Sequence, residues 1–156
     1  MNILFMCTAN SCRSVLSEGL FNHLAPEGMT AVSSGSFPSG RLHPRAVSTL
    51  QVLGIDTSRL YSKSSESFES NPPDIVITVC DKARGEPCPV YFGPAIRSHW
   101  GLSDPSDVAG TDEEVQAAFD ATVAHIRKRF VAFFALDLGA LDSAELKQAL
   151  DRIGEL

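Results

Sequence analysis

The stretch NILFMCTANSCRSVLSEGLFNHL, residues 2–24, predicts a strand, a polar loop and a helix in direct succession. Its apolar run at residues 2–6 stops at the polar loop of residues 7–13. From Ser14 onward, apolar residues recur at three- and four-residue spacing, which is typical of one face of an amphipathic helix. A strand that leads through a short loop into a helix favours an α/β fold, in which helical crossovers join parallel strands.

The same alternation of strands and helices continues along the chain. Three further strands are expected, at residues 29–34, 74–79 and 95–100. Three further helices are expected, at residues 44–53, 115–134 and 142–153. The strand DIVITV is continuous and rich in β-branched residues, as a strand buried on both faces should be. The pattern predicts a single three-layer α/β domain, residues 1–156, whose small parallel sheet is covered on both sides.

Residues 137–156 are expected to form a C-terminal helical extension. The sequence Asp142-Ser-Ala-Glu145 resembles a capping box, with Ser143 as an alternative cap. An amphipathic helix at this place would either cover the sheet or form a dimer contact, and the sequence leaves both alternatives open.

Length and composition limit the classes of function. The chain has 156 residues, of which 44% are hydrophobic and 21% charged, values that suit one globular domain and exclude a wholly disordered chain. The 13 Lys and Arg against 19 Asp and Glu give a formal net charge of −6. This argues against nucleic acid as the main partner, because neutralising phosphates requires a basic face. An anionic substrate would need a site that concentrates positive potential locally.

Neither a membrane span nor an export signal is expected. The longest apolar run, residues 130–141, is interrupted by Asp137 and Gly139. The N-terminus lacks the basic segment and the apolar length of a signal peptide, so we expect a cytoplasmic protein. In that reducing compartment the four cysteines are expected to be reactive or buried thiols rather than structural disulfides.

The segment Cys7-Thr-Ala-Asn-Ser-Cys-Arg13-Ser14 carries the clearest chemical signal. It lies between the end of a strand and the start of a helix, where backbone N–H groups and the helix dipole favour an anion. The five residues between Cys7 and Arg13 allow the loop to curl around the sulfur, and the guanidinium can grip two oxygens at once. Such a nest would bind a tetrahedral oxyanion and stabilise a thiolate. The alternative interpretation is a buried structural cysteine followed by a surface arginine, since a bare Cys-x5-Arg spacing is weak evidence.

Two further residues of this loop have expected roles. The Ser14 hydroxyl would donate a hydrogen bond to the Cys7 thiolate. Asn10 would hold the curl, because asparagine tolerates left-handed backbone angles.

On these residues, the loop resembles the anion-binding loop of the low-molecular-weight tyrosine phosphatase superfamily, and more narrowly that of the arsenate reductases built on the same fold. The resemblance covers residues 2 to about 136. It implies a four-stranded parallel sheet of flavodoxin-like type, with Cys7 as the nucleophile. It also implies a substrate-binding loop made of Thr8, Ala9, Asn10, Ser11, Cys12, Arg13 and Ser14. For Cys12 itself, a small residue packed under the loop is the favoured interpretation.

Two later cysteines separate reductase from phosphatase chemistry. Cys80 directly follows the strand of residues 74–79, and Cys88 follows in a loop rich in glycine and proline. The resemblance implies that Cys80 is the second redox cysteine and Cys88 the third. A thiolate that attacks the Cys7 adduct has to come from a mobile segment. Taken alone, each of the two could also be a buried or incidental thiol.

The dipeptide Asp104-Pro105 is the second discriminating feature. In the superfamily an Asp-Pro at this place supplies the general acid, which is expected to keep its proton near the thiolate and the anion. An ordinary Asp-Pro turn is the alternative. Tyrosine phosphatases of this type place aromatic residues directly after that proline, whereas the chain here continues Ser106-Asp107-Val108. This favours a reductase over an enzyme for aryl phosphates.

The resemblance therefore implies reduction of arsenate to arsenite by a relay of three cysteines. Cys7 attacks arsenate, and Asp104 gives a proton to the departing hydroxyl. Cys80 then attacks Cys7 and releases arsenite, and Cys88 takes over the disulfide. Thioredoxin, or glutaredoxin with glutathione, is the implied reductant.

No cofactor is expected to be required, and the spacings of the cysteines and histidines predict no metal site. Some arsenate reductases of this branch bind potassium beside the active loop, and Asn10, Glu18 and Ser33 fall at the matching positions. For Glu18, a solvated helix residue is an equal alternative. Two other classes stay open. A phosphatase for a protein or a small phosphate ester would not need Cys80 and Cys88, and a non-catalytic redox sensor would not need a general acid.

Overall fold

The computed structural model describes residues 1–64, 71–81 and 93–156. Within these ranges, four strands form one parallel sheet in the order β2-β1-β3-β4. Their bounds are Asn2–Cys7 for β1, Thr30–Gly35 for β2, Ile75–Thr78 for β3 and Ile96–His99 for β4. The predicted four-stranded parallel sheet is confirmed. Because all the strands run the same way, their carboxyl ends meet at one edge of the sheet.

The described part of the chain also contains four α-helices. Their bounds are Arg13–Leu24 for α1, Pro44–Val52 for α2, Asp112–Phe134 for α3 and Ser143–Ile153 for α4, with short 3₁₀ turns at Pro105–Asp107 (η3) and Leu138–Ala140 (η4). Helix α3 begins earlier than its apolar pattern predicts, because the Thr111 side chain caps it by accepting a hydrogen bond from the Glu114 N–H at 3.2 Å. Among these helices none combines the length and the apolar character needed to cross a bilayer.

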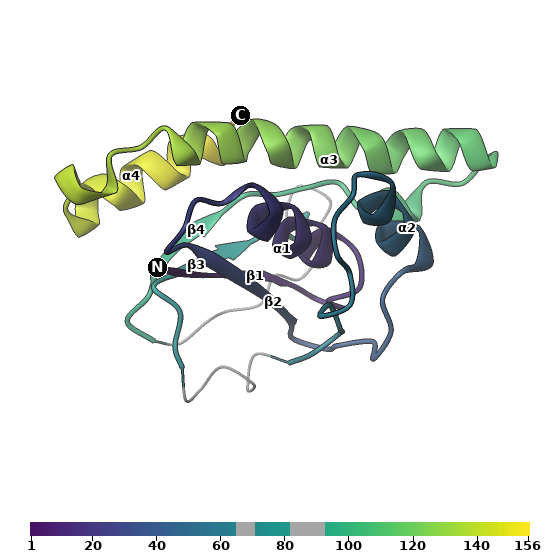
Figure 1. Ribbon diagram of the computed structural model, residues 1–156, viewed down its shortest axis with the longest axis horizontal. Coiled ribbons are helices and arrows are strands. Elements are labelled where there is room, and N and C mark those ends of the chain that lie inside the picture. Colours follow the sequence, from purple (N-terminus) through teal and green to yellow (C-terminus); the bar gives the residue numbers. More distant parts are fainter. Residues whose placement is uncertain (65–70, 82–92) are drawn as a thin grey trace.

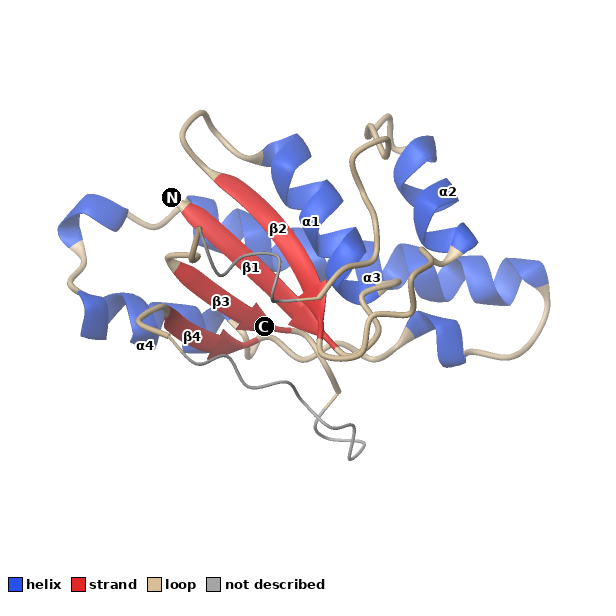
Figure 2. Ribbon diagram, turned by 90° about the horizontal axis from the view of Figure 1, so that it is seen from below, coloured by secondary structure: helices blue, strands red, loops and turns tan. Residues whose placement is uncertain are grey.

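Helices α1, α3 and α4 lie on one face of the sheet, and α2 packs against α1 and α3 (Figures 1 and 2). Figure 2 looks onto the opposite face, with the four strands in front of the helices. On that opposite face Leu4, Met6 and Val76 are also buried, with at most 1% of their surface exposed. The central strands β1 and β3 are therefore buried on both faces, as their apolar sequences predict.

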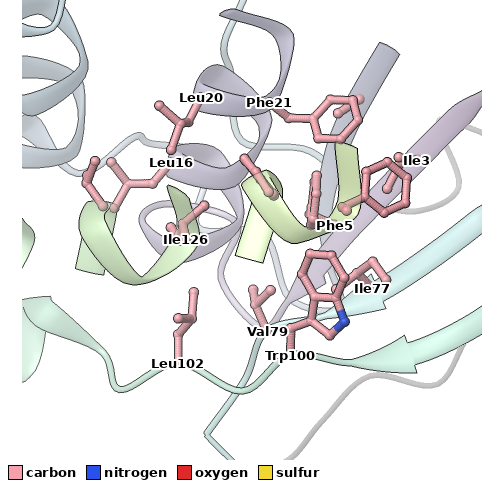
Figure 3. Close-up of a cluster of buried hydrophobic side chains, with 14 of the residues drawn as sticks. Ile3, Phe5, Leu16, Leu20, Phe21, Ile77, Val79, Trp100, Leu102 and Ile126 are labelled. Carbon is pink, nitrogen blue, oxygen red and sulfur yellow. The ribbon is translucent and has the colours of Figure 1, made fainter. Parts of the chain in front are cut away.

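The main hydrophobic core lies between the sheet and the helices (Figure 3). From β1, the side chains of Ile3 and Phe5 point toward the helices. From α1, Leu16 and Phe21 meet them, and Phe21 packs edge-on against Phe130 of α3 with ring centroids 5.3 Å apart. Burying each such side chain contributes about 1.5–3 kcal/mol before the entropy cost of ordering it. This packing holds α1 against β1 and so fixes both ends of the loop that joins them.

Helix α1 is buried on all sides rather than on one face. It is enclosed along residues 13–21, where polar residues such as Ser14 and Glu18 are buried too. The apolar spacing predicts an amphipathic helix, and the difference arises because a second layer covers the outer side of α1. There Leu50 of α2 lies so close to Gly19 that a Cβ at Gly19 would come within 2.9 Å of it.

The C-terminal helix α4 packs against β4. The Trp100 Nε1–H donates to the Leu150 carbonyl at 2.9 Å, and the Ser98 hydroxyl donates to Asp151 at 2.7 Å. The predicted capping box at the start of α4 is confirmed, with both of its hydrogen bonds present. Of the two roles considered for residues 137–156, the structure shows α4 covering the sheet.

Arg129 of α3 joins the end of β4 to the C-terminal segment. Its Nη1 donates to the Gly101 carbonyl at 3.1 Å and its Nη2 to the Gly154 carbonyl at 3.0 Å. Burial lowers the pKa of this guanidinium below its ordinary value. We expect Arg129→Met to lower the free energy of unfolding by about 2 kcal/mol, because both carbonyls lose this donor. Chemical denaturation measures the change.

The control for that prediction is Arg127→Met, the same substitution at an exposed position of the same helix. It should change the free energy of unfolding by less than about 0.5 kcal/mol. Equal losses for the two variants would show that the carbonyl contacts of Arg129 are not what stabilises this region.

Candidate active site

The loop that joins β1 to α1 curls around the sulfur of Cys7. Its carbonyl groups point outward, toward the chain that follows β2. The carbonyls of Cys7, Thr8, Ala9 and Ser11 accept hydrogen bonds from the N–H groups of Ser36, Phe37, Ser39 and His43, at 2.8 to 3.2 Å. In a trans peptide, the C=O and the next N–H point in opposite directions, so the N–H groups of residues 8–10 and 12 face the inside of the loop. Such a ring of donors favours an anion at its centre.

Two residues allow the loop to take this shape. Asn10 has a φ of 48°, in the left-handed region that asparagine tolerates. Gly35 lies against the loop from β2. A Cβ at Gly35 would collide with the Thr8 carbonyl oxygen and come within 2.9 Å of the Asn10 nitrogen, so a side chain there would push the loop outward. Asn10 was predicted for this role, whereas Gly35, which directly follows the strand predicted at residues 29–34, had no predicted role in the site.

The Cys7 sulfur has hydrogen-bond partners on two sides. It lies 2.9 Å from the Ser14 hydroxyl oxygen and 3.3 Å from the Asn10 backbone nitrogen. The Asn10 side-chain NH₂ donates to Ser14 Oγ at 2.8 Å. Because that NH₂ can only donate, Ser14 accepts from it and still has its own proton to give. A thiolate can only accept, so Ser14 would donate this proton to Cys7 once the sulfur is ionised. Two donors on one sulfur suit a thiolate nucleophile.

The Asn10 side chain is held in a defined orientation. The Lys63 backbone N–H donates to Asn10 Oδ1 at 2.9 Å, which turns the NH₂ toward Ser14 and Ser33. The Ser33 hydroxyl in turn donates to Glu18 Oε1 at 2.6 Å. A continuous chain of hydrogen bonds therefore runs from Glu18 to the Cys7 sulfur.

Arg13 connects the loop to the segment that carries Asp104. Its Nη1 donates to the Leu102 carbonyl at 3.0 Å, and its Nη2 lies 3.4 Å from Asp104 Oδ2. The other carboxylate oxygen, Oδ1, accepts from the backbone N–H and the hydroxyl of Ser106, at 3.0 and 2.6 Å. Asp104 Oδ2 is therefore the oxygen that faces the loop. The structure brings the predicted general acid beside the predicted anion-binding arginine, although they are 91 residues apart.

Cys12 is a packed thiol at the N-cap of α1, with 4% of its surface exposed. Burial, and to a smaller extent the negative charge of Asp104, raises the pKa of Cys12 far above that of an ordinary thiol. In the reduced native protein at mildly alkaline pH, we expect iodoacetamide to alkylate Cys12 at least about 100-fold more slowly than in the urea-unfolded chain. Mass spectrometry of the Cys12 peptide follows the reaction. Comparable rates in the two states would contradict the packed, inert thiol.

Cys80 leaves the sheet next to Cys7. One residue, Val79, separates it from the end of β3, and the Val79 N–H donates to the Met6 carbonyl of β1 at 2.9 Å. Cys80 is fully buried and disulfide-bonded, whereas Cys7 is a free thiol. Cys88, the third predicted redox cysteine, lies outside the described residues.

Lys63 belongs to the site, although sequence reasoning did not identify it. Its Nζ donates to Glu18 Oε1 at 3.2 Å and to the Tyr61 carbonyl at 3.1 Å, and 7% of its surface is exposed. Lys63 stands in a polar, serine-rich stretch without apolar periodicity, 45 residues from Glu18. Only the tertiary structure brings this pair together, so no pattern in the sequence could have found it.

The residues matched to the potassium site of some family members lie together, but three of their side-chain oxygens are already engaged. Asn10 Oδ1 accepts from the Lys63 backbone, and Ser33 Oγ accepts from Asn10 and donates to Glu18. Glu18 Oε1 accepts from both Ser33 and the Lys63 ammonium. A hard cation needs several oxygens that turn lone pairs toward it, so this donor set fits the ammonium rather than a potassium ion. Over the ranges that the structure describes, no three His, Cys, Asp or Glu side chains are grouped as metal ligands.

Comparison with known proteins places these features in a family. The family model for low molecular weight phosphotyrosine protein phosphatase matches residues 2–150. An arsenate reductase of Bacillus subtilis is 36% identical over 131 residues, which cover 84% of this chain and 93% of the relative. A glutaredoxin arsenate reductase of Synechocystis sp. is 36% identical over 103 residues, which cover 66% of this chain and 77% of the relative.

Solved structures agree with the sequence matches. The crystal structure of an arsenate reductase from Archaeoglobus fulgidus aligns with a TM-score of 0.67 and 26% identity, covering 81% of this chain and 94% of that one. A thioredoxin-dependent arsenate reductase of Corynebacterium glutamicum aligns with a TM-score of 0.61 and 25% identity, covering 85% of this chain and 61% of that one. By sequence and by fold, the chain belongs to the low molecular weight phosphotyrosine protein phosphatase family, alongside the arsenate reductases built on this fold.

Proposed function

We propose that this protein reduces arsenate to arsenite, with Cys7 as the nucleophile and a relay of three cysteines. The observation that carries the proposal is the position of Cys80, two residues beyond the end of β3, the strand that pairs with the one ending at Cys7. A phosphatase needs no second sulfur there, whereas a reductase has to draw two electrons from thiols. The names of the relatives, arsenate reductases in sequence and in structure, support the same assignment.

The first step joins arsenate to Cys7. The inward N–H groups and the Arg13 guanidinium hold the oxygens of the substrate in the loop. The thiolate, aimed by the Ser14 hydroxyl at 2.9 Å, attacks the arsenic atom, and one hydroxyl of arsenate departs as water. A thiol–arsenic(V) adduct remains on Cys7.

Asp104 supplies the proton for that departing hydroxyl. Ser106 holds its Oδ1, and Oδ2 faces the guanidinium that grips the substrate. We expect Asp104→Asn to lower kcat for arsenate by about 10²–10³-fold, because the amide cannot give up a proton as an acid does. The KM for arsenate should stay within about threefold, since binding rests on Arg13 and the loop. Steady-state kinetics of arsenite release measures both constants.

The matched control is Asp107→Asn, at an exposed position of the same η3 turn. Its kcat should stay within about twofold of the parent value. A comparable loss in both variants would mean that charge at this turn, rather than a proton from Asp104, supports the reaction.

The second step transfers two electrons. The Cys80 thiolate attacks the Cys7 sulfur of the adduct, and the sulfur–arsenic bond breaks with its electron pair on arsenic. Arsenite leaves, and a Cys7–Cys80 disulfide forms. Cys88 then attacks Cys80, which frees Cys7 and passes the disulfide on to an external reductant. The bonding state of the described cysteines, with Cys80 in a disulfide and Cys7 free, supports such a relay.

Thioredoxin is the proposed reductant, and glutaredoxin with glutathione is the alternative. Relatives of both kinds are named among the matches. In the Cys88→Ser variant, steady turnover with thioredoxin should fall to background, because no exchange then frees Cys7. Unchanged turnover would contradict the relay and favour the glutaredoxin route.

Counting thiols tests the proposed function directly. The fully reduced protein is mixed with arsenate, or with phosphate as control, and its free thiols are then alkylated and counted by mass spectrometry. We expect two thiols to disappear with arsenate alone, in the parent and in a Cys12→Ala control. In Cys80→Ser none should disappear, and in Cys88→Ser the lost pair should map to Cys7 and Cys80.

Two outcomes would overturn the assignment. Survival of all four thiols in arsenate, together with hydrolysis of an aryl phosphate, would make the protein a phosphatase. Loss of thiols to general oxidants with no arsenite released from arsenate would make it a redox sensor.

A further inference from the structure

Glu18 and Lys63 form a buried ion pair behind the active loop. The Lys63 ammonium lies 3.2 Å from Glu18 Oε1, and the two side chains are only 6% and 8% exposed. The ammonium also donates to the Tyr61 carbonyl at 3.1 Å and lies 4.4 Å from the centre of the Tyr61 ring. A buried charge is costly unless it is paired and hydrogen-bonded, and Lys63 meets both conditions for Glu18.

This ion pair lies at the far end of the hydrogen-bond chain that leads to the nucleophile. The same Glu18 oxygen accepts from Ser33, and Ser33 accepts from the Asn10 NH₂ that also holds Ser14. Lys63 acts on the chain twice, because its backbone N–H fixes the Asn10 amide while its ammonium balances Glu18. Its position therefore bears on how Ser14 meets the Cys7 sulfur.

We propose that the Lys63 ammonium is the resident cation of this active site, and that it makes the active loop independent of potassium or any other monovalent metal ion. The pair is formally neutral, so an added ion would place an uncompensated positive charge in a buried space. Lys63 is therefore a positioning residue, which acts on Cys7 through Glu18, Ser33, Asn10 and Ser14. This role of Lys63 concerns the loop itself and is the same for any oxyanion that Cys7 attacks.

Three proteins test the proposal: the parent, Lys63→Ala and the double variant Glu18→Gln/Lys63→Ala. Lys63→Ala leaves the Glu18 carboxylate without its cation and opens room for a small one. The double variant opens the same room but removes the carboxylate. Each protein is measured in potassium chloride and in choline chloride at equal ionic strength, because choline is too large to enter that space. The readouts are Tm and the rate at which iodoacetamide alkylates Cys7 at neutral pH.

For the parent, we expect Tm to differ by less than about 1 °C between the two salts, and the alkylation rate by less than about 1.5-fold. In choline, Lys63→Ala should lose about 5 °C or more in Tm, and its Cys7 should react roughly tenfold more slowly, because one partner of a buried pair is missing. Potassium should restore at least half of both losses. In the double variant, the two salts should give the same values.

Every other outcome overturns the proposal. If the Tm of the parent rose by several degrees in potassium, or its Cys7 reacted faster there, the site would bind a potassium ion alongside the Lys63 ammonium. If Lys63→Ala had the same Tm and Cys7 alkylation rate as the parent in choline, the ammonium would not stabilise the active loop. If potassium did not restore the Tm and the alkylation rate of Lys63→Ala, the Lys63 side chain would contribute packing rather than its positive charge. If Lys63→Ala does not fold in choline, refolding it in each salt gives the same comparison, and the parent measurement does not depend on any variant.

Discussion

Replacing Cys7 by serine should reduce arsenate turnover by at least about 10⁴-fold, because a hydroxyl is a far weaker nucleophile than a thiolate and cannot pass electrons to arsenic. The loss should fall on kcat and persist at saturating arsenate, since the Arg13 guanidinium and the inward N–H groups stay in place. Serine fits the space of Cys7, where Ser14 Oγ and the Asn10 N–H lie 2.9 and 3.3 Å from the sulfur. The free energy of unfolding should therefore change by no more than about 1 kcal/mol.

The control for this prediction removes the other sulfur of the same loop. Cys12→Ala should keep turnover within about tenfold of the parent, because the raised pKa of Cys12 keeps its thiol protonated and unreactive. Isothermal titration with phosphate, a tetrahedral oxyanion that no thiol reduces, should show that Cys7→Ser still binds. Turnover by Cys7→Ser at a substantial fraction of the parent rate would assign the attack on arsenic to another cysteine.

The contrast between Cys7 and Lys63 shows which parts of the site the sequence could predict. Cys7, Arg13 and Ser14 belong to one loop between a strand and a helix, so local patterns suffice to bring them together. Asp104 is 91 residues from Arg13, and its proposed role rests on a resemblance rather than on spacing. Lys63 was missed because nothing local marks it: a single lysine among serines has the same appearance whether it is solvated or paired with Glu18.

The same limit applies to the fold. Apolar spacing predicts the four strands and the main helices, because burial of one face follows from the period of the chain. It does not predict that α1 is enclosed on all sides, because Glu18 is polar and its burial depends on Lys63, a partner 45 residues along the chain. Buried polar residues such as Ser14 and Glu18 are the ones that form the hydrogen-bond chain of the active site.

Replacing Arg13 by lysine should lower kcat/KM for arsenate by about 10²–10³-fold, although the charge is kept. The guanidinium at this position reaches the Leu102 carbonyl at 3.0 Å and Asp104 Oδ2 at 3.4 Å with two different nitrogens. A lysine ammonium is a single point of charge, so it can hold the substrate or the Asp104 segment but not both in the right geometry. Unlike Asp104→Asn, this variant should therefore lose both binding and kcat, and its affinity for phosphate should fall by at least about tenfold.

Arg45→Lys provides the matched control. Arg45 also pairs with a carboxylate, that of Asp112 at 3.2 Å, but Asp112 is fully exposed and the pair lies outside the active loop. An exposed pair of this kind contributes about 1 kcal/mol or less, so kinetics and stability should barely change. If Arg13→Lys bound phosphate as tightly as the parent, the oxyanion would be held by the loop N–H groups and the helix terminus alone. The arginine would then act on catalysis only through Asp104, and the kcat losses of Arg13→Lys and Asp104→Asn would not add in the double variant.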